Sequence, residues 1–221
     1  MQFDEQGHIV WSPKELYQAA VDDPRGLVNG FLMTGTPCAF QTYSQYYDFL
    51  DAVAERTGIH PKNLYLRGSC HIGFSIAPKS KVWTAMRHNS DLDLVIVDPS
   101  YYHRFDQEIR SWDDRNSTEF LSEAEAQAYV RRQKDRRYNF CRDNDLPSVV
   151  CVHHKGTMKR VADLAHCGHW RKVSAFIYPD WHSAQERYLY DLRELQKGIE
   201  KGELTRPGDT PLPSEGRKYS R

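Results

Sequence analysis

Apolar side chains recur every three to four residues in two stretches of the chain, and this spacing predicts two amphipathic α-helices. It is the spacing of one helical face, and it runs from residue 43 to 57 and again from 181 to 199. Gly58 is placed to end the first helix, and Asp180 is placed to cap the second. The two apolar faces consist of Tyr43, Tyr46, Tyr47, Leu50, Val53 and Ala54, and of Trp181, Ala184, Tyr188, Leu192, Leu195 and Ile199.

Two more helices are predicted from the residues that open them. Ser12 and Ser122 are each followed three positions later by a glutamate, Glu15 and Glu125, and such a pair forms a capping box at a helix start. The first of these helices is short and ends near residue 23, whereas the second is long and polar and reaches about residue 141.

Short apolar runs predict four β-strands, at residues 63–67, 92–97, 147–153 and 172–178. The run LDLVIV at 92–97 is apolar on both faces after its first turn, which is typical of a strand that is covered on both sides. Helices and strands mix along the chain, and this order predicts an α+β (mixed α/β) fold with a central mixed sheet flanked by helices.

The composition of the chain divides it into three segments and excludes one class of protein. The chain has 221 residues, of which 39% are hydrophobic, and Lys plus Arg equals Asp plus Glu at 30 each. It therefore lacks the basic excess of a protein that binds nucleic acid mainly by electrostatics. We expect an N-terminal helix and irregular segment at 1–40, a main domain at 41–200, and a disordered tail at 201–221, because the tail is polar and proline-rich.

The start of the chain and its cysteines bear on location. No stretch approaches the roughly 20 apolar residues of a membrane span, and residues 1–11 lack the basic and apolar pattern of an export signal. Five cysteines without a framework spacing fit reduced thiols. We therefore predict a cytoplasmic protein with no membrane partner.

Two carboxylates open the apolar strand at 92–97. Side chains alternate along a strand, so Asp91 and Asp93 share one face and repel each other unless a cation lies between them. Mg²⁺ takes oxygen ligands and is usually held by one or two carboxylates and substrate phosphates. Gly68 and Ser69 follow the preceding strand, where a glycine allows the backbone to approach a phosphate closely. A solvent-exposed strand entry, with Asp91 in a turn, is the alternative.

The segments LRGS at 66–69 and SDLDLVI at 90–96 resemble the signature of the nucleotidyltransferase superfamily with the DNA polymerase beta fold. The resemblance is to a small stand-alone member, and such members often act in toxin–antitoxin or anti-phage systems. It implies a nucleotidyltransferase-like domain at 41–200 that moves a nucleoside monophosphate from an NTP, such as ATP, to a hydroxyl group on a protein, an RNA end or a small molecule.

The resemblance also implies roles for residues. Asp91, Asp93 and Ser69 would be catalytic, and the two aspartates would bind Mg²⁺ or Mn²⁺. The residues that would bind the nucleotide are Arg67, Gly68, Ser69, Lys79 and Lys81. Arg67 has an alternative role, which is to pair with an acid in the core.

Two departures from the family pattern leave alternatives open. The 21 residues between Ser69 and Asp91 (91 − 69 − 1) are more than the family usually has. They would form a hairpin or a lid over the nucleotide, or they would keep Gly68 and Asp91 apart. The strand predicted at 147–153 carries no third acid, and His153 would take that place as a metal ligand suited to Zn or Mn. Asp163 and Asp98 are further candidates. The alternative function is a degenerate site that only binds a nucleotide or a protein partner.

Two other clusters carry weaker signals. Their members are Cys151, His153, His154, His166, Cys167 and His169 in the first, and the basic run RRQKDRR at 131–137 in the second. The first does not have the spacing of a zinc finger, so zinc is not expected. Arg132 and Arg136 share a helical face, which would be either a solvated surface or a site that attracts the phosphate of RNA or a nucleotide.

Overall fold

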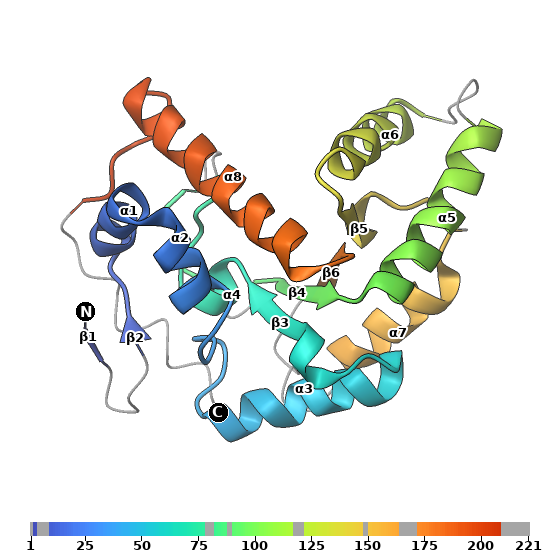
Figure 1. Ribbon diagram of the computed structural model, residues 1–221, viewed down its shortest axis with the longest axis horizontal. Coiled ribbons are helices and arrows are strands. Elements are labelled where there is room, and N and C mark those ends of the chain that lie inside the picture. The colour runs from blue at the N-terminus through green and yellow to red at the C-terminus, as the bar shows by residue number, and fades with distance from the viewer. Residues whose placement is uncertain are drawn as a thin grey trace.

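A four-stranded mixed sheet forms the centre of the structure, a computed structural model that describes residues 2–3, 9–77, 82–87, 90–116, 122–147, 150–163 and 172–208. In the strand order β3-β4-β6-β5, β4 runs antiparallel to β3 and parallel to β6, and β5 is antiparallel to β6 (Figure 1). These strands are β3 (Leu64–Arg67), β4 (Leu92–Val97), β5 (Cys141–Arg142) and β6 (Val173–Tyr178), and a separate pair consists of β1 (Gln2–Phe3) and β2 (Ile9–Val10). The predicted α+β fold with a mixed sheet is confirmed.

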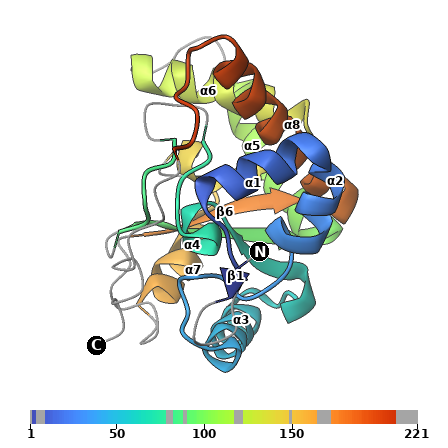
Figure 2. The same ribbon diagram turned by 90° about the vertical axis from the view of Figure 1, so that its left-hand side faces the viewer.

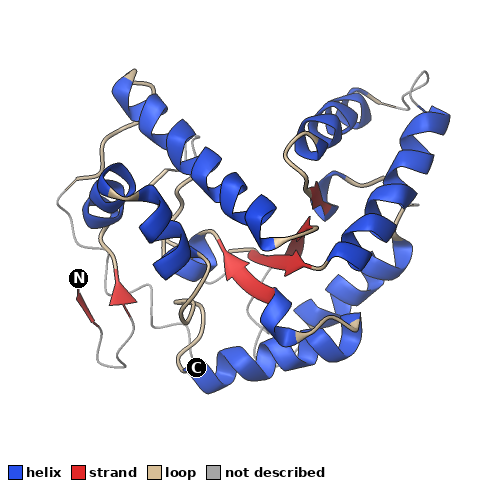
Figure 3. Cartoon of the chain, in the orientation of Figure 1, coloured by secondary structure: helices blue, strands red, loops and turns tan. Residues whose placement is uncertain are grey.

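Helices cover both faces of this sheet (Figure 3). The longer ones are α1 (Pro13–Asp22), α3 (Tyr43–Thr57), α5 (Pro99–Asn116), α6 (Glu123–Arg136), α7 (Val152–Ala162) and α8 (Trp181–Glu200). The short ones are α2 (Pro24–Leu27), η1 (Val28–Leu32), η2 (Pro61–Asn63), α4 (Ser69–Ile72) and η3 (Asp143–Asp145). Within the described part of the chain, no helix is both long and apolar enough to cross a membrane.

Alternate residues of the strands face the two helical layers. Leu66 and Leu94 are buried with residues of α3, α5 and α7, whereas Tyr65 and Val95 are buried with residues of α1 and α8. Figure 2 shows α1 and α2 beside α8, with α3 below them. The prediction that the strand at 92–97 is covered on both sides is therefore confirmed.

The first helices belong to this core. Leu16 of α1 and Val28 and Leu32 of η1 are buried in one cluster with Val95 of β4 and Leu192 of α8. The stretch from 13 to 32 thus covers the sheet as an integral layer.

The predicted helix ends are confirmed by their hydrogen bonds. Ser12 and Glu15 form a complete capping box, and the Ser122 hydroxyl accepts from the Glu125 N–H at 3.2 Å. Gly58 ends α3 with a φ of 72°, in the left-handed region that favours glycine. Local sequence therefore determines where α1 and α6 begin and where α3 ends, whereas α6 ends at Arg136, before the predicted end near residue 141.

The strand predicted at 147–153 is wrong. Val152 begins α7, and the fourth strand of the sheet is instead β5, where the sequence predicted the end of a helix. The buried residues His154, Thr157, Met158 and Val161 are spaced three and four apart, which is a helical face. Val150 and Cys151, which precede them, are therefore the approach to a helix.

The sequence also failed to predict α5, because its buried face contains charges. Phe105 and Ile109 lie on that face together with Asp106 and Asp113, which are 6% and 3% exposed. Because two aspartates interrupt the apolar face, the sequence does not show the spacing of apolar residues that predicts an amphipathic helix. These carboxylates are buried because α6 supplies cations for both.

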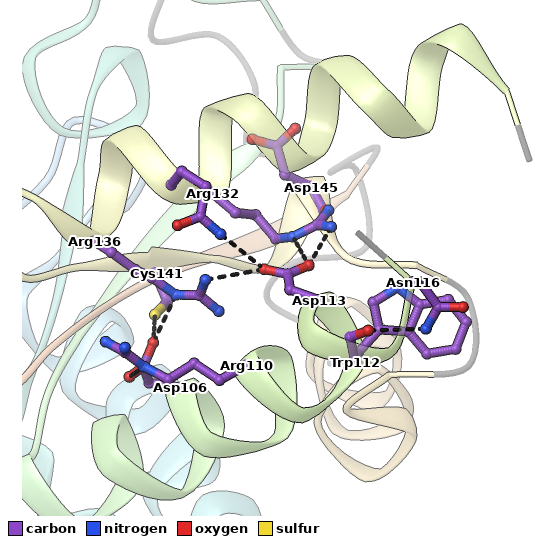
Figure 4. A network of polar contacts seen from close by, with 10 residues as sticks. Asp106, Arg110, Trp112, Asp113, Asn116, Arg132, Arg136, Cys141 and Asp145 are labelled. Atoms are coloured by element: carbon purple, nitrogen blue, oxygen red, sulfur yellow. Dashed lines mark hydrogen bonds and ion pairs between the residues drawn. The ribbon is translucent and has the colours of Figure 1, made fainter. Parts of the chain in front are cut away.

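Arg132 and Arg136 of α6 are the partners, so neither role expected for their shared face is correct (Figure 4). Arg132 donates to Asp113 Oδ1 from Nη2 at 2.6 Å and from Nε at 3.1 Å. Arg136 donates to Asp113 Oδ2 and to Asp106 Oδ1, both at 3.0 Å. The two side chains are 5% and 10% exposed, and they hold α6 against α5.

The insert before the aspartate pair forms a hairpin at its base. Phe74 pairs with Ala85, and the Ser75 and Trp83 N–H groups donate to Thr84 O and Ser75 O at 2.9 and 2.7 Å. The hairpin alternative thus holds for the described residues 73–77 and 82–87. Lys79 and Lys81, the predicted nucleotide ligands, lie outside the described residues.

The first part of the predicted disordered tail makes defined contacts. Trp83 Nε1 donates to Thr205 O at 2.9 Å, and Leu204 lies so close to Gly198 that a Cβ there would be 2.6 Å from Leu204 Cδ1. The prediction of disorder is therefore wrong for residues 203–205, and residues 209–221 lie outside the described residues.

Truncation after Glu203 is expected to lower the free energy of unfolding by about 1–2 kcal/mol. The deletion removes the hydrogen bond to Trp83 and the apolar contact of Leu204, each worth on the order of 1 kcal/mol. Urea denaturation measures the change, and truncation after Gly208 is the control. Equal stability of the two truncated proteins would show that the contacts of residues 204–208 contribute nothing.

Candidate functional site

The ends of the strands gather the motif residues at one edge of the sheet. The register pairs Arg67 with Asp93 across β3 and β4, and Asp93 with Ser174 across β4 and β6. Gly68 follows β3 directly, and Asp143 follows β5 at the same end of the sheet. The two halves of the motif are therefore neighbours in space, because β3 and β4 pair directly in the sheet.

Gly68 and Asp93 make the closest approach within this site. Gly68 has a φ of 70°, and a Cβ on it would lie 2.8 Å from Asp93 Oδ2. The backbone can pass the carboxylate at this distance only because the residue is a glycine. The structure thus brings together Gly68 and Asp93, while Ser69 and Asp91 flank them in the sequence.

Gly68→Ala is expected to lower the free energy of unfolding by more than Gly58→Ala, whose own cost is about 1–3 kcal/mol of backbone strain. Gly58 has nearly the same φ, 72°, but a Cβ on it would have no heavy atom within 4 Å. The extra loss of free energy of unfolding in Gly68→Ala comes from the contact with Asp93. Adding Asp93→Ala to Gly68→Ala should therefore recover this extra loss. Urea denaturation of the four variants, including Asp93→Ala alone, measures it, and equal costs at Gly58 and Gly68 would contradict the contact.

The Asp93 carboxylate is half-buried and hydrogen-bonded, whereas Asp91 is exposed. Ser174 Oγ donates to Asp93 Oδ1 at 2.7 Å. Burial is the largest cause that raises the pKa of Asp93, and the negative charges of Asp91 and Asp143 raise it further. The Ser174 hydrogen bond and the positive charge of Arg67 act in the opposite direction. A cation placed here would relieve the repulsion among the three carboxylates.

The turn after Gly68 is held from two sides. The Cys38 and Ala39 N–H groups donate to the carbonyls of His71 and Cys70, both at 3.0 Å. His71 Nδ1 lies 2.9 Å from Leu66 O and, since a carbonyl only accepts, carries the proton of that bond. Ser69 is half-exposed at the start of α4, next to the Gly68–Asp93 contact.

Arg67 takes the core role that the sequence left open. Its guanidinium donates to Asp191 of α8 at 2.8 Å and to the Tyr178 hydroxyl at 3.1 Å. It is stacked between the rings of Phe176 and Tyr188, each at 4.6 Å. Its side chain is 12% exposed, so its contacts hold α8 on the sheet.

His153 does not have the environment expected of a third metal ligand. It lies on α7 with an exposed side chain, and the described residues 150–153 form no strand that would carry it. Asp98 is at the opposite end of β4, where its Oδ1 accepts from the Tyr101 N–H at 2.7 Å. Asp163 is exposed at the end of α7.

Asp143 is the acid that the sequence reasoning missed. Its side chain is 8% exposed, its Oδ2 lies 3.2 Å from His154 Nε2, and its Oδ1 is buried without a hydrogen-bond partner in the described structure. Its charge reaches Asp93, whose pKa it helps to raise. The available signal was the acidic run Asp143-Asn144-Asp145, which lies before the strand predicted at 147–153.

No three His, Cys, Asp or Glu side chains of the described residues are close enough together to hold a metal ion as they stand. This applies to the aspartates of the site and to Cys151 and His154 of the suggested zinc cluster. The other members of that cluster, at 166, 167 and 169, lie outside the described residues.

Comparisons of the chain with family models, with curated proteins and with solved structures found no match.

Proposed function

We propose that this chain is a cytoplasmic nucleotidyltransferase, which moves a nucleoside monophosphate from an NTP to a hydroxyl group of an acceptor with Mg²⁺ or Mn²⁺ as cofactor. The observation that carries the proposal is the approach of Gly68 to the Asp93 carboxylate, so close that a Cβ on the glycine would lie 2.8 Å from Oδ2. It supports a single site built from the glycine-serine turn and the aspartate pair.

The residues present fit a divalent cation by two observations. The space beside Asp93 is one that a Cβ on Gly68 would fill, and the buried Asp143 Oδ1 has no hydrogen-bond partner in the described structure. Asp91 and Asp93 would hold the cation, and phosphate oxygens of the substrate would complete its ligands. A divalent cation supplies activation of the attacking hydroxyl and neutralisation of charge on the phosphates.

The residues of the chain contribute positioning. Gly68 allows the backbone to approach the triphosphate closely, and the half-exposed Ser69 hydroxyl would donate to a phosphate oxygen. Ser174 fixes the Asp93 carboxylate through Oδ1 and leaves Oδ2 facing the glycine. Lys79 and Lys81 remain predicted ligands of the triphosphate.

A binding module with a degenerate site is the second candidate. The observation in its favour is that no three potential ligands are close enough to hold a metal within the described residues. A protein of this kind would bind an NTP without transferring any part of it.

Incubation with each α-labelled NTP and Mg²⁺ or Mn²⁺ tests the proposal. The acceptors are the protein itself, added RNA and a mixture of small hydroxyl compounds. Label on any of them supports transfer, and label on a protein or RNA would also support the toxin or anti-phage role that the resemblance implies. Nucleotide binding without transfer under all conditions would identify the degenerate module, and the absence of both would reject the two candidates.

Metal and nucleotide together are expected to stabilise the wild-type protein. A ligand that binds only the folded state adds about 2.7 kcal/mol to the free energy of unfolding at 100 times its dissociation constant. Thermal melts with Mg²⁺ or Mn²⁺ and a non-hydrolysable NTP measure this shift. Metal-free buffer with EDTA is the control, and an unchanged melting temperature at millimolar ligand would contradict a metal–nucleotide site.

A further inference from the structure

A cleft of about 430 Å³ lies between η1 and the first turns of α8, apart from the aspartate site. This volume is within the range of ligand-binding pockets. Ser174, which contacts Asp93, is at the start of β6, whereas α8 follows the other end of that strand. Roughly 13 Å of strand separates Ser174 from Tyr178, at a rise of about 3.3 Å per residue. The cleft is therefore a second site, at the opposite end of the sheet. Its lining residues are Asn29, Met33, Thr34, Trp181, His182 and Gln185.

The widened turn of η1 places three of these side chains on one face. The Met33 N–H donates to Val28 O at 3.0 Å, which is the i→i+5 hydrogen bond of a π-helix. Because the turn is wider than that of an α-helix, Asn29 lies on the same side of the backbone as the residues four and five positions later, Met33 and Thr34. Turns of this kind occur frequently at functional sites.

Trp181 of α8 supplies an aromatic surface to the cleft. One face of its indole is stacked on Tyr65, with 5.4 Å between centroids and 19° between planes, and the residue is still 40% exposed. Tyr65 thus fixes the ring in place while its other side stays open to the cleft. A fixed, exposed indole favours a flat aromatic ligand, because stacking buries both surfaces and few side-chain rotations are lost.

An amide pair in the same cleft supplies hydrogen-bonding groups of fixed direction. Gln185 Nε2 donates to Asn29 Oδ1 at 2.5 Å. This bond leaves Asn29 Nδ2 as a donor and Gln185 Oε1 as an acceptor, and neither atom has a partner among the described residues. The edge of a nucleobase offers the matching groups, as the ring nitrogen and the amino group of adenine do. None of the six lining side chains is an acid, a lysine or an arginine, so the cleft fits an uncharged base and not a phosphate.

We propose that this cleft binds a nucleobase, which stacks on Trp181 and hydrogen-bonds to Asn29 and Gln185. The base belongs either to a free nucleoside or to a single-stranded RNA. No metal ion or triphosphate takes part, so the inference goes beyond the proposed function and does not rest on it.

Isothermal titration calorimetry in EDTA measures the binding of adenosine and of hexa-adenylate RNA, with ribose 5-phosphate as the probe that lacks a base. Trp181→Ala removes the stacking surface, Trp181→Phe keeps an aromatic ring, and Asn29→Ala removes one amide. Tyr43→Ala is the matched control, because Tyr43 is also exposed and also packs against a second ring, that of Tyr47 at 4.4 Å. Thermal melts show whether each variant is folded.

We expect Trp181→Ala to weaken adenosine binding by about 5–150-fold, the range of one base–aromatic stack. Trp181→Phe should restore part of the affinity, Tyr43→Ala should bind like the wild type, and ribose 5-phosphate should not bind.

The two probes identify the source of the base. If the RNA binds more tightly than adenosine and Trp181→Ala weakens both, the base belongs to RNA, whereas equal affinities identify a free nucleoside. Wild-type affinity in Trp181→Ala, or no binding of either probe at millimolar concentration, would overturn the inference and leave the test of nucleotidyl transfer untouched. If Trp181→Ala fails to fold, Asn29→Ala decides by the same criterion, since Asn29 is exposed.

Discussion

Replacing Asp113 by alanine is expected to lower the free energy of unfolding by about 3–5 kcal/mol, the cost of removing one partner from a buried ion pair. Asp113 accepts from Arg132 and Arg136, and all three side chains are at most 10% exposed. The substitution would leave two guanidinium groups in the interior with too few acceptors. Urea denaturation measures the change.

Asp114→Ala is the matched control, because Asp114 is the next residue on α5 and is exposed. Its substitution should change the free energy of unfolding by no more than about 0.5 kcal/mol. Similar effects at positions 113 and 114 would mean that the network shown in Figure 4 does not stabilise the packing of α6 on α5.

Replacing Asp93 by asparagine is expected to reduce nucleotidyl transfer by roughly a thousandfold or more. A cation in such a site contributes several kcal/mol to the transition state, and each 1.36 kcal/mol corresponds to about a tenfold change in rate. The variant should also lose the stabilisation by Mn²⁺ and NTP. Single-turnover transfer of the labelled nucleotide measures the first effect, and thermal melts measure the second.

The same substitution should leave the metal-free protein at least as stable as the wild type. The folded-state pKa of Asp93 is raised by burial above its ordinary value of 3.8, so the folded protein binds its proton more tightly than the unfolded chain. The contribution of this group to stability therefore falls as the pH rises from below 3.8 through the raised pKa. Asparagine keeps an acceptor for Ser174 without the charge, so its advantage should appear over that window and persist at neutral pH.

Asp51→Asn, on the exposed face of α3, is the control for both measurements. It should leave transfer and the pH dependence of stability as in the wild type. If Asp93→Asn instead destabilises the metal-free protein and the wild type ignores metal and nucleotide, then Asp93 is structural and the enzyme proposal falls.

The sequence predicted the two strands on which Gly68 and Asp93 depend, and they meet because β3 and β4 are antiparallel neighbours in the sheet. The register of β3 with β4 places the two motif halves side by side, and the long insert does not interfere since its base closes as a hairpin. The position of Asp143 at the same end of the sheet was not predicted, because Asp143 follows β5, an edge strand of two residues that has no recognisable period.

For some side chains the sequence allowed two roles, and only the residues that they contact in the structure show which role applies. Arg67 follows a strand and precedes a glycine in either role, and the decision came from Asp191, 124 residues away. The role of the basic run on α6 was also decided by distant partners. The carboxylates that neutralise Arg132 and Arg136 lie 19 to 30 residues earlier in the chain.

The sequence by itself determined the helices at 43–57 and 181–200 and the strands β3, β4 and β6, because periodicity and caps act between residues a few positions apart. Only the tertiary structure decided which charges are buried, namely Asp106 and Asp113 against α6 and Asp143 against His154. A buried charge is stable only where a distant partner compensates it, and the residues next to it in the chain do not encode that partner.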